Sequence, residues 1–230
     1  MQNTLRIYME RTEEINYYFE LIKPLEDDKM VLFFGKSKIY TQIPRKEQFF
    51  KILKSNFLLM LYNLVESTII NGLLEIYEKI KENDCSYQEV IDEIQDIWIN
   101  WKIRDVYGNS STKLITYKNK IKEMILCIAN DTPIDLSKNS LDIKGNLDAR
   151  KIRKLCQDHK IICSLSTQGE HLLRVKNDRN KLAHGDVSFS DCARDLTMRD
   201  LEKIRDDVFS FLKDVLNGMQ KYYDDELYKR

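Results

Sequence analysis

The stretch Phe57–Leu74, with the sequence FLLMLYNLVESTIINGLL, decides the fold. Placed on a helix it is apolar almost all round, which is typical of the central helix of a bundle. Its longest nearly apolar run, Phe57–Val65, is interrupted by Asn63 and is far shorter than the roughly 20 residues that cross a bilayer. We therefore expect a buried core helix, inside a helical stretch that follows Pro44 and reaches about Asn83.

The composition agrees with a helical protein. The 230 residues include only 7 Gly and 3 Pro, while 43% are hydrophobic and 32% are charged. So few turn-forming residues disfavour a sandwich or barrel of many strands. A chain of this length can bury one substantial core, and neither a repeat nor a linker divides it. We expect one all-α domain over residues 1–230, with an N-terminal accessory part over about residues 1–45.

Capping residues predict where the other helices begin and end. Two segments around Gly35, Met30–Phe34 and Lys38–Ile43, predict a small β-hairpin, and residues 130–144 a loop. In the first half of the chain we expect a helix over Thr4–Lys23 that stops at Pro24, and a helix that carries Trp98 and Trp101 and opens with a capping box of Ser86 and Glu89. A third helix is expected over Thr112–Ala129. In the second half we expect a helix from the cap Asn146 to Asp158, one over Gln168–His184 that ends at Gly185, and one over Met198–Tyr222 that follows the cap Thr197.

The cysteines and the N-terminal residues give information about the cellular compartment of the protein. The five cysteines form an odd set without a C-x-x-C pair, which suits reduced thiols. The first residues, MQNTLR, lack the basic and apolar regions of a secretory signal. These features predict a cytoplasmic protein.

The charges are balanced overall but not along the chain. There are 37 Lys and Arg against 37 Asp and Glu, yet residues 144–184 hold ten basic and four acidic residues. Residues 185–230 hold eight basic and eleven acidic residues. A basic segment in a neutral chain is typical of a confined phosphate-binding site, although a solvated lysine-rich helix face gives the same pattern.

The basic segment contains Leu172–Gly185, LLRVKNDRNKLAHG. On a helix, Arg179 falls at the centre of an apolar stripe of Leu172, Val175, Leu182 and Ala183. A guanidinium there must be paired or must face a partner surface, because an unpaired buried charge is very costly. A neighbouring face holds Asn177, Asn180 and His184. We expect His184 in the last turn, where the negative end of the helix dipole favours a cation.

On the residues alone, two interpretations of this helix stay open. In the first, Arg179 packs through its stem and pairs with an acid while His184 caps carbonyl groups. In the second, the two side chains form a site for a phosphate.

The motif Arg179-Asn180-Lys181-Leu182-Ala183-His184 resembles the R-N-x-x-x-H signature of the HEPN ribonuclease superfamily, bundle proteins of bacterial toxin and antiviral loci. Other segments resemble its MAE-type branch, and the likeness covers about residues 57–74 and 145–216. These segments are Leu61–Glu66, Gly145–Asp148, Ser188–Ser190 with Arg194, and Asp200-Leu201. The resemblance implies an all-α helical bundle of the HEPN type.

The resemblance also implies a metal-independent endoribonuclease without a cofactor. Arg179 and His184 would be catalytic, with Asn180 as the polar member of the motif. RNA carries its own nucleophile, the 2′-hydroxyl, so cleavage needs a group that exchanges a proton and a cation that stabilises the phosphorane. The implied partners are RNA, a second copy of the chain in a homodimer, and an antitoxin or regulatory protein encoded nearby.

Further residues are candidates for supporting roles. Glu66 is a partner for Arg179, and Asn63 a residue that orients RNA or His184, unless both are simply exposed. We expect the basic residues Arg174, Lys176 and Lys181 to border an RNA-binding groove.

Other functions remain open at this stage. A bundle of the same family without catalysis would bind a nucleotide, RNA or a protein, and a helical scaffold would carry the motif by coincidence. Zinc is a weaker alternative, because its nominal ligands Cys156, His159, Cys163 and His171 match no ordinary finger spacing. Asp178, Asp186 and Asp191 are more typical of helix caps than of a magnesium site.

Overall fold

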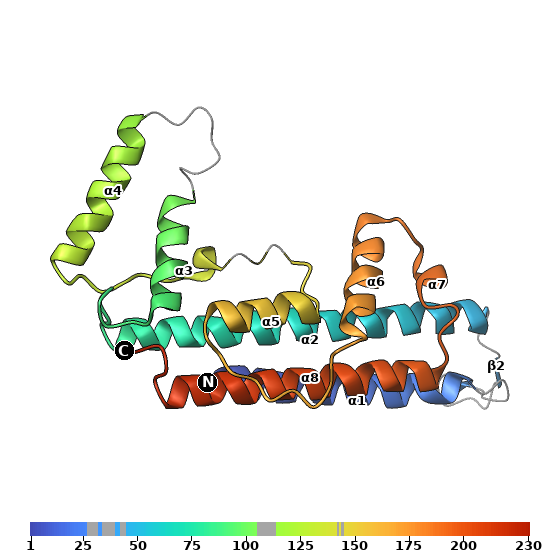
Figure 1. Cartoon of the computed structure of the whole chain (residues 1–230). Helices are drawn as coiled ribbons and strands as arrows, with labels where there is room; N and C mark the ends of the chain where they lie inside the picture. Colours follow the sequence, from blue (N-terminus) through green and yellow to red (C-terminus); the bar gives the residue numbers. More distant parts are fainter. Residues whose placement is uncertain (27–31, 34–39, 42–44, 105–113, 142, 144) are drawn as a thin grey trace.

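The computed structural model describes residues 1–26, 32–33, 40–41, 45–104, 114–141, 143 and 145–230. Three long helices form its body: α1 (Gln2–Ile22), α2 (Lys46–Glu82) and α8 (Met198–Asp224). Both α1 and α8 pack along α2 and contact each other, so the three form one elongated bundle (Figure 1). The prediction of an all-α bundle is confirmed.

Helix α2 is the central helix that the apolar stretch predicted, and it is unbroken. Its buried residues point to several sides, because α1, α6, α7 and α8 all contact it. Among the described residues it alone is long and apolar enough to cross a membrane, and 56% of its most apolar window is buried inside the bundle. Its hydrophobic surface is therefore used for packing between helices.

The smaller elements lie on one side of this three-helix bundle (Figure 1). Helices α3 (Asp92–Ile103) and α4 (Leu114–Ala129) rise from one end, while α6 (Leu172–His184) and α7 (Phe189–Cys192) lie towards the other. Helix α5 (Ala149–Asp158) lies along α2 between the two groups (Figure 1). Short 3₁₀ helices span Lys23–Glu26 and Lys138–Ser140.

The described part of the hairpin agrees with the prediction. Strand β1 (Leu32–Phe33) pairs antiparallel with β2 (Tyr40–Thr41). The other residues of the predicted hairpin, and the predicted start of α4 at Thr112, lie outside the described residues.

Two predicted helix ends are confirmed. The Thr197 side chain accepts the N–H of Asp200 in a complete capping box that opens α8. Gly185 follows α6 with a left-handed φ of 75°, a conformation that a residue without a Cβ adopts at little cost.

Two predicted helix starts are wrong, the first because a residue distant in sequence supplies the partner and the second because a local contact closes a separate turn. Helix α1 begins before Thr4, and Glu75 of α2 accepts the N–H of Thr4 at 3.2 Å and pairs with the Met1 amino group at 3.0 Å. The Ser86 N–H does donate to Glu89 at 2.8 Å, but this contact closes a separate turn. Helix α3 begins only at Asp92.

The predicted starts of α5 and α6 are also wrong. Asp148 caps α5 by accepting the N–H of Lys151 at 2.9 Å, whereas Asn146 has a left-handed φ of 61°. Helix α6 begins at Leu172, four residues after the predicted Gln168, because Gly169 is left-handed at φ 64°. A Cβ at Gly169 would lie 2.8 Å from the ring of Phe211, so this close turn requires glycine.

Candidate functional site

Helix α6 stands across α2 and presents the R-N-x-x-x-H motif. Its Leu172, Val175 and Leu182 are buried, as the apolar stripe predicted. Ala183 is exposed, so its assignment to that stripe is wrong. In its last turn Leu182 is buried, whereas Lys181, Ala183 and His184 are exposed.

The guanidinium of Arg179 is held from three directions. Its Cζ lies 4.7 Å from the centroid of the Tyr62 ring, a cation–π distance. Nη2 is 4.0 Å from the carboxylate of Glu66, and Nη1 donates to Oδ1 of Asn180 at 3.0 Å. The side chain remains 31% exposed. Arg179 therefore has the acidic partner that the first interpretation required, and it is also open to a ligand from solvent.

The Asn180 side chain is fixed in turn by the loop before α5. Its amide nitrogen donates to Oδ1 of Asn146. The left-handed Asn146 follows the left-handed Gly145, a conformation that asparagine adopts more readily than most residues. The buried hydroxyl of Tyr62 accepts the N–H of Leu147 at 3.3 Å, so the same loop is tied to the ring beneath Arg179.

His184 is the last residue of α6 and is exposed. Within the described residues its ring takes part in no hydrogen bond or ion pair, in contrast to Arg179. Five positions along a helix correspond to a rotation of about 140° and a rise of about 7.5 Å. The Arg179 and His184 Cα–Cβ bonds of one chain therefore point to different faces of α6.

The three predicted border cations have different surroundings. Lys181 is exposed, and Nε of the half-exposed Arg174 lies 3.4 Å from Asp178. Lys176 is only 16% exposed and pairs with Asp148 at 2.9 Å. Lys176 thus ties α6 to the cap of α5, which differs from the prediction of a cation on an open groove.

This contact also changes the acidity of Asp148. Burial raises the pKa of its carboxyl group, but the hydrogen bonds from Lys176 and from the N–H of Lys151 outweigh burial. The net result is a pKa below the ordinary value for aspartate.

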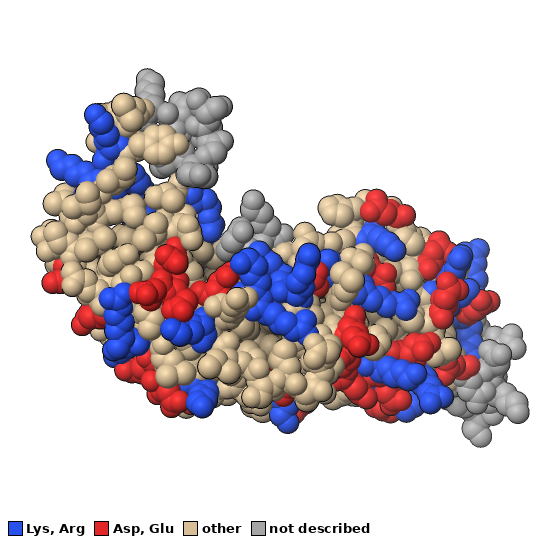
Figure 2. All heavy atoms as spheres, in the orientation of Figure 1, with Lys and Arg blue, Asp and Glu red and all other residues tan. Residues whose placement is uncertain are grey.

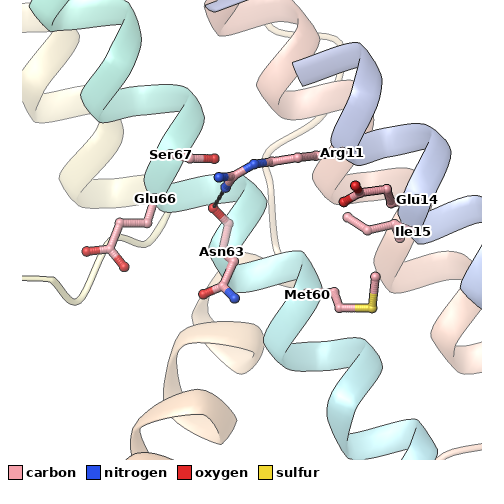
Figure 3. A pocket seen from close by; sticks show the side chains of 7 residues that line it. All are labelled: Arg11, Glu14, Ile15, Met60, Asn63, Glu66 and Ser67. Atoms are coloured by element: carbon pink, nitrogen blue, oxygen red, sulfur yellow. Dashed lines mark hydrogen bonds between the residues drawn. The ribbon is translucent and has the colours of Figure 1, made fainter. Parts of the chain in front are cut away.

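Glu66 and Asn63 lie at the edge of a surface pocket of about 460 Å³ between α1 and α2. The Asn63 carbonyl accepts a hydrogen bond from Nη1 of Arg11 at 3.2 Å, and its exposed side chain has no hydrogen bond to His184 among the described residues. The seven lining residues, drawn in Figure 3, are Arg11, Glu14, Ile15, Met60, Asn63, Glu66 and Ser67.

Sequence reasoning missed Tyr62 and Arg11 as parts of this neighbourhood. Tyr62 lies inside the Leu61–Glu66 segment, one turn of helix before Glu66, and that spacing was the available signal. No local pattern distinguishes Arg11 from the other charged residues of α1. Only the packing of α1 on α2 brings it to the pocket.

Of the four nominal zinc ligands, Cys156 and Cys163 lie close together, with 3.8 Å between their sulfurs, but the two histidines have other partners. The ring nitrogens of His159 contact the Tyr77 hydroxyl and the Leu155 carbonyl, both at 2.7 Å. His171 lies 3.0 Å from Asp207. In the described parts of the chain, no group of three or more His, Cys, Asp or Glu side chains is placed to hold a metal ion.

Comparison with known families agrees with the motif. A family model described as HEPN_MAE_28990-like HEPN matches residues 4–228, well beyond the two segments that carried the resemblance. Neither a curated protein nor a solved structure shows significant similarity to the chain. Because the match covers nearly the whole sequence, the chain belongs to the MAE-type branch of the HEPN superfamily.

Proposed function

We propose that this protein is an endoribonuclease that cleaves RNA by attack of a 2′-hydroxyl on the adjacent phosphorus. The observation that carries the proposal is the Arg179 guanidinium, which Tyr62, Glu66 and Asn180 hold in place while it stays partly exposed. A guanidinium fixed in this way is preorganised for an anion, and little ordering is left to occur when a phosphate binds.

The chemistry uses two side chains. The 2′-oxygen forms a bond to phosphorus, and the bond from phosphorus to the 5′-oxygen breaks. The products are a 2′,3′-cyclic phosphate and a 5′-hydroxyl. His184 exchanges a proton with one of the two oxygens, and the remaining N–H donors of Arg179 stabilise the charge on the phosphorane.

A basic surface on α5 supports an RNA ligand. Arg150, Lys151, Arg153 and Lys154 lie on this helix, and Figure 2 shows blue side chains gathered over it between the two raised groups of helices. The loop that leads into α5 contacts Asn180, so this surface is continuous with the Arg179 site. Lysine and arginine along such a path attract the phosphates of a strand that extends beyond the cleaved bond.

We further propose that two chains form a homodimer around the site. The Arg179 and His184 of one chain point to different faces of α6, and Lys181, Ala183 and His184 at the end of α6 are exposed. A two-fold contact between these ends would place two histidines and two arginines around one phosphate and provide both an acid and a base. Lys181 residues facing each other would oppose assembly, so a bound polyanion should strengthen the dimer.

The biological setting is part of the same proposal. A cytoplasmic toxin or antiviral effector, restrained by an antitoxin or regulatory protein encoded nearby, fits the family and the reduced cysteines. The five described cysteines are all free, with Cys156 and Cys163 the close pair at 3.8 Å.

Incubation of the purified protein with RNA in EDTA tests the proposed reaction. We expect cleavage to persist, with 2′,3′-cyclic phosphate or its hydrolysis product at the new ends. An Arg179→Ala variant should be inactive, while Arg199→Ala, an exposed arginine of α8, is the matched control with full activity. Tight RNA binding without any cleavage would instead favour a non-catalytic binding module.

A further inference from the structure

The pocket between α1 and α2 begins where the Arg179 site ends. Glu66 lines this pocket and also pairs with Arg179, so the two share a wall. Figure 3 shows Asn63 between Glu66 on one flank and Arg11 with Glu14 on the other. A strand whose phosphate sits at Arg179 would therefore have a neighbouring nucleotide beside this pocket.

The charges in the pocket argue against a second phosphate. Among the described residues that line it, Arg11 is the one cation, whereas Glu14 and Glu66 are two carboxylates. Two carboxylates beside one guanidinium repel an anion. The pocket is therefore better suited to a neutral group that offers both hydrogen-bond donors and acceptors.

The size and walls of the pocket fit such a group. A volume of about 460 Å³ lies within the common range for small-ligand sites. Ile15 and Met60 supply apolar surface, and the Ser67 hydroxyl and the Asn63 amide supply further polar atoms. An aromatic ring with polar edges is the kind of group that these walls accommodate.

We propose that this pocket binds an unpaired guanine base next to the cleaved phosphate, an inference that rests on the proposed ribonuclease function. Arg11 and Glu14 are three positions apart on α1 and so share one face of that helix. Guanine presents two acceptors, O6 and N7, that match the fork of a guanidinium. It also presents two adjacent donors, at N1 and N2, that match a carboxylate.

The other bases match this pair of side chains less well. Adenine has a single donor group on its exocyclic nitrogen beside ring acceptors, and it lacks the acceptor pair that a guanidinium fork prefers. Cytosine and uracil each offer one donor group to a carboxylate. Guanine alone satisfies both Arg11 and Glu14 with two hydrogen bonds each.

Binding of uncleavable RNA tests the pocket separately from catalysis. Four short single strands with 2′-fluoro sugars, uniform except for one central A, C, G or U, are titrated against the protein by fluorescence anisotropy. We expect the guanine strand to bind tighter, on the order of 10-fold, because one bidentate contact discriminates by about that factor. Glu14→Gln should remove this preference, and Glu13→Gln, the exposed neighbour on α1, should retain it.

The outcomes for the pocket and for the enzyme are distinguishable. Equal affinity for the four strands, or a guanine preference that Glu14→Gln leaves intact, overturns the guanine pocket. Cleavage of the matching 2′-hydroxyl strands without base preference overturns it as well, while the ribonuclease function stands. A third outcome is that the protein binds guanine strands selectively, loses this selectivity in Glu14→Gln, and yet cleaves none of the 2′-hydroxyl strands. That outcome supports the guanine pocket and contradicts the ribonuclease function.

Discussion

Two histidines at the ends of neighbouring helices have opposite surroundings. His159 follows the last residue of α5, and His184 is the last residue of α6. His159 is 2% exposed, and both of its ring nitrogens have protein partners, whereas His184 is exposed and its ring has none among the described residues. The difference teaches that a position at a helix end says little about function, because packing decides whether the ring can reach a ligand.

The contacts of His159 also fix its protonation. Because the Leu155 carbonyl can only accept, Nδ1 must donate to it, and Nε2 then accepts from the Tyr77 hydroxyl. Burial lowers the pKa of His159 below its usual value, although the Leu155 hydrogen bond opposes this shift. The buried ring is therefore held neutral and is part of the core.

The largest expected effect concerns the exposed histidine. His184→Ala should reduce RNA cleavage on the order of 10²–10⁴-fold, because a general acid or base is lost. Its melting temperature should stay close to that of the wild type, since His184 is exposed and its ring has no hydrogen bond or ion pair among the described residues. Rates of RNA cleavage and thermal melts on the same preparations check both parts. A folded His184→Ala protein with full activity would remove His184 from the mechanism.

The buried histidine should show the reverse pattern. His159→Ala should lower the free energy of unfolding by about 2–4 kcal/mol, because it leaves a cavity and an unpaired Tyr77 hydroxyl. The fraction that remains folded should cleave RNA at the wild-type rate. Urea unfolding followed by fluorescence gives the stability, and active-site titration gives the specific activity. Loss of activity in the folded fraction would mean that the two histidines are coupled.

The pH dependence of stability sharpens the comparison. The folded-state pKa of His159 is lowered, so its contribution is present above the unfolded value of about 6.5 and is lost as the pH falls below it. The slope from this one group is at most about 1.4 kcal/mol per pH unit. His159→Gln should flatten the slope relative to the wild type. Urea unfolding between pH 4 and 8 measures both slopes.

The smallest expected effect is at the tie between α5 and α6. Lys176→Met leaves the mostly buried Asp148 without its cation and should cost about 1–2 kcal/mol at pH 7. Because the pKa of Asp148 is lowered, this contribution is present above about pH 4 and is lost as the pH falls through the folded value. The two proteins should thus converge in stability at acid pH. Lys154→Met, an exposed lysine of α5, is the matched control.

Hydrophobic patterning was sufficient to predict α2 and the order of the helices, because the burial of a helix is visible in its own residues. The starts of α1 and α5 were not predictable in the same way. Glu75 of α2 accepts a hydrogen bond from the N–H of Thr4 in α1. At the start of α5, Asp148 and Asn146 are both suitable capping residues and lie two positions apart, and the structure uses Asp148. Such contacts depend on residues that only the folded chain brings together.

The candidate site likewise contains residues that the sequence names and contacts that only the folded chain creates. Arg179, Asn180 and His184 belong to one local motif, so the sequence alone names them as candidates, and the structure joins Arg179 to Asn180. The contact between Arg179 and Tyr62 joins two helices that are far apart in the sequence, and Arg11 reaches the neighbouring pocket from a third helix. From the sequence, Lys176 was expected at the border of an RNA-binding groove. Its ion pair with Asp148 is evident only in the structure.

The most direct test of the account uses one RNA and one oxygen atom. Once a cleaved bond is mapped, the same RNA is made with a single 2′-deoxyribose on the 5′ side of that bond. The account predicts that this strand binds with nearly the same affinity and is not cut at that position, because phosphate contacts remain while the nucleophile is gone. Cleavage of the substituted bond at a comparable rate would contradict it.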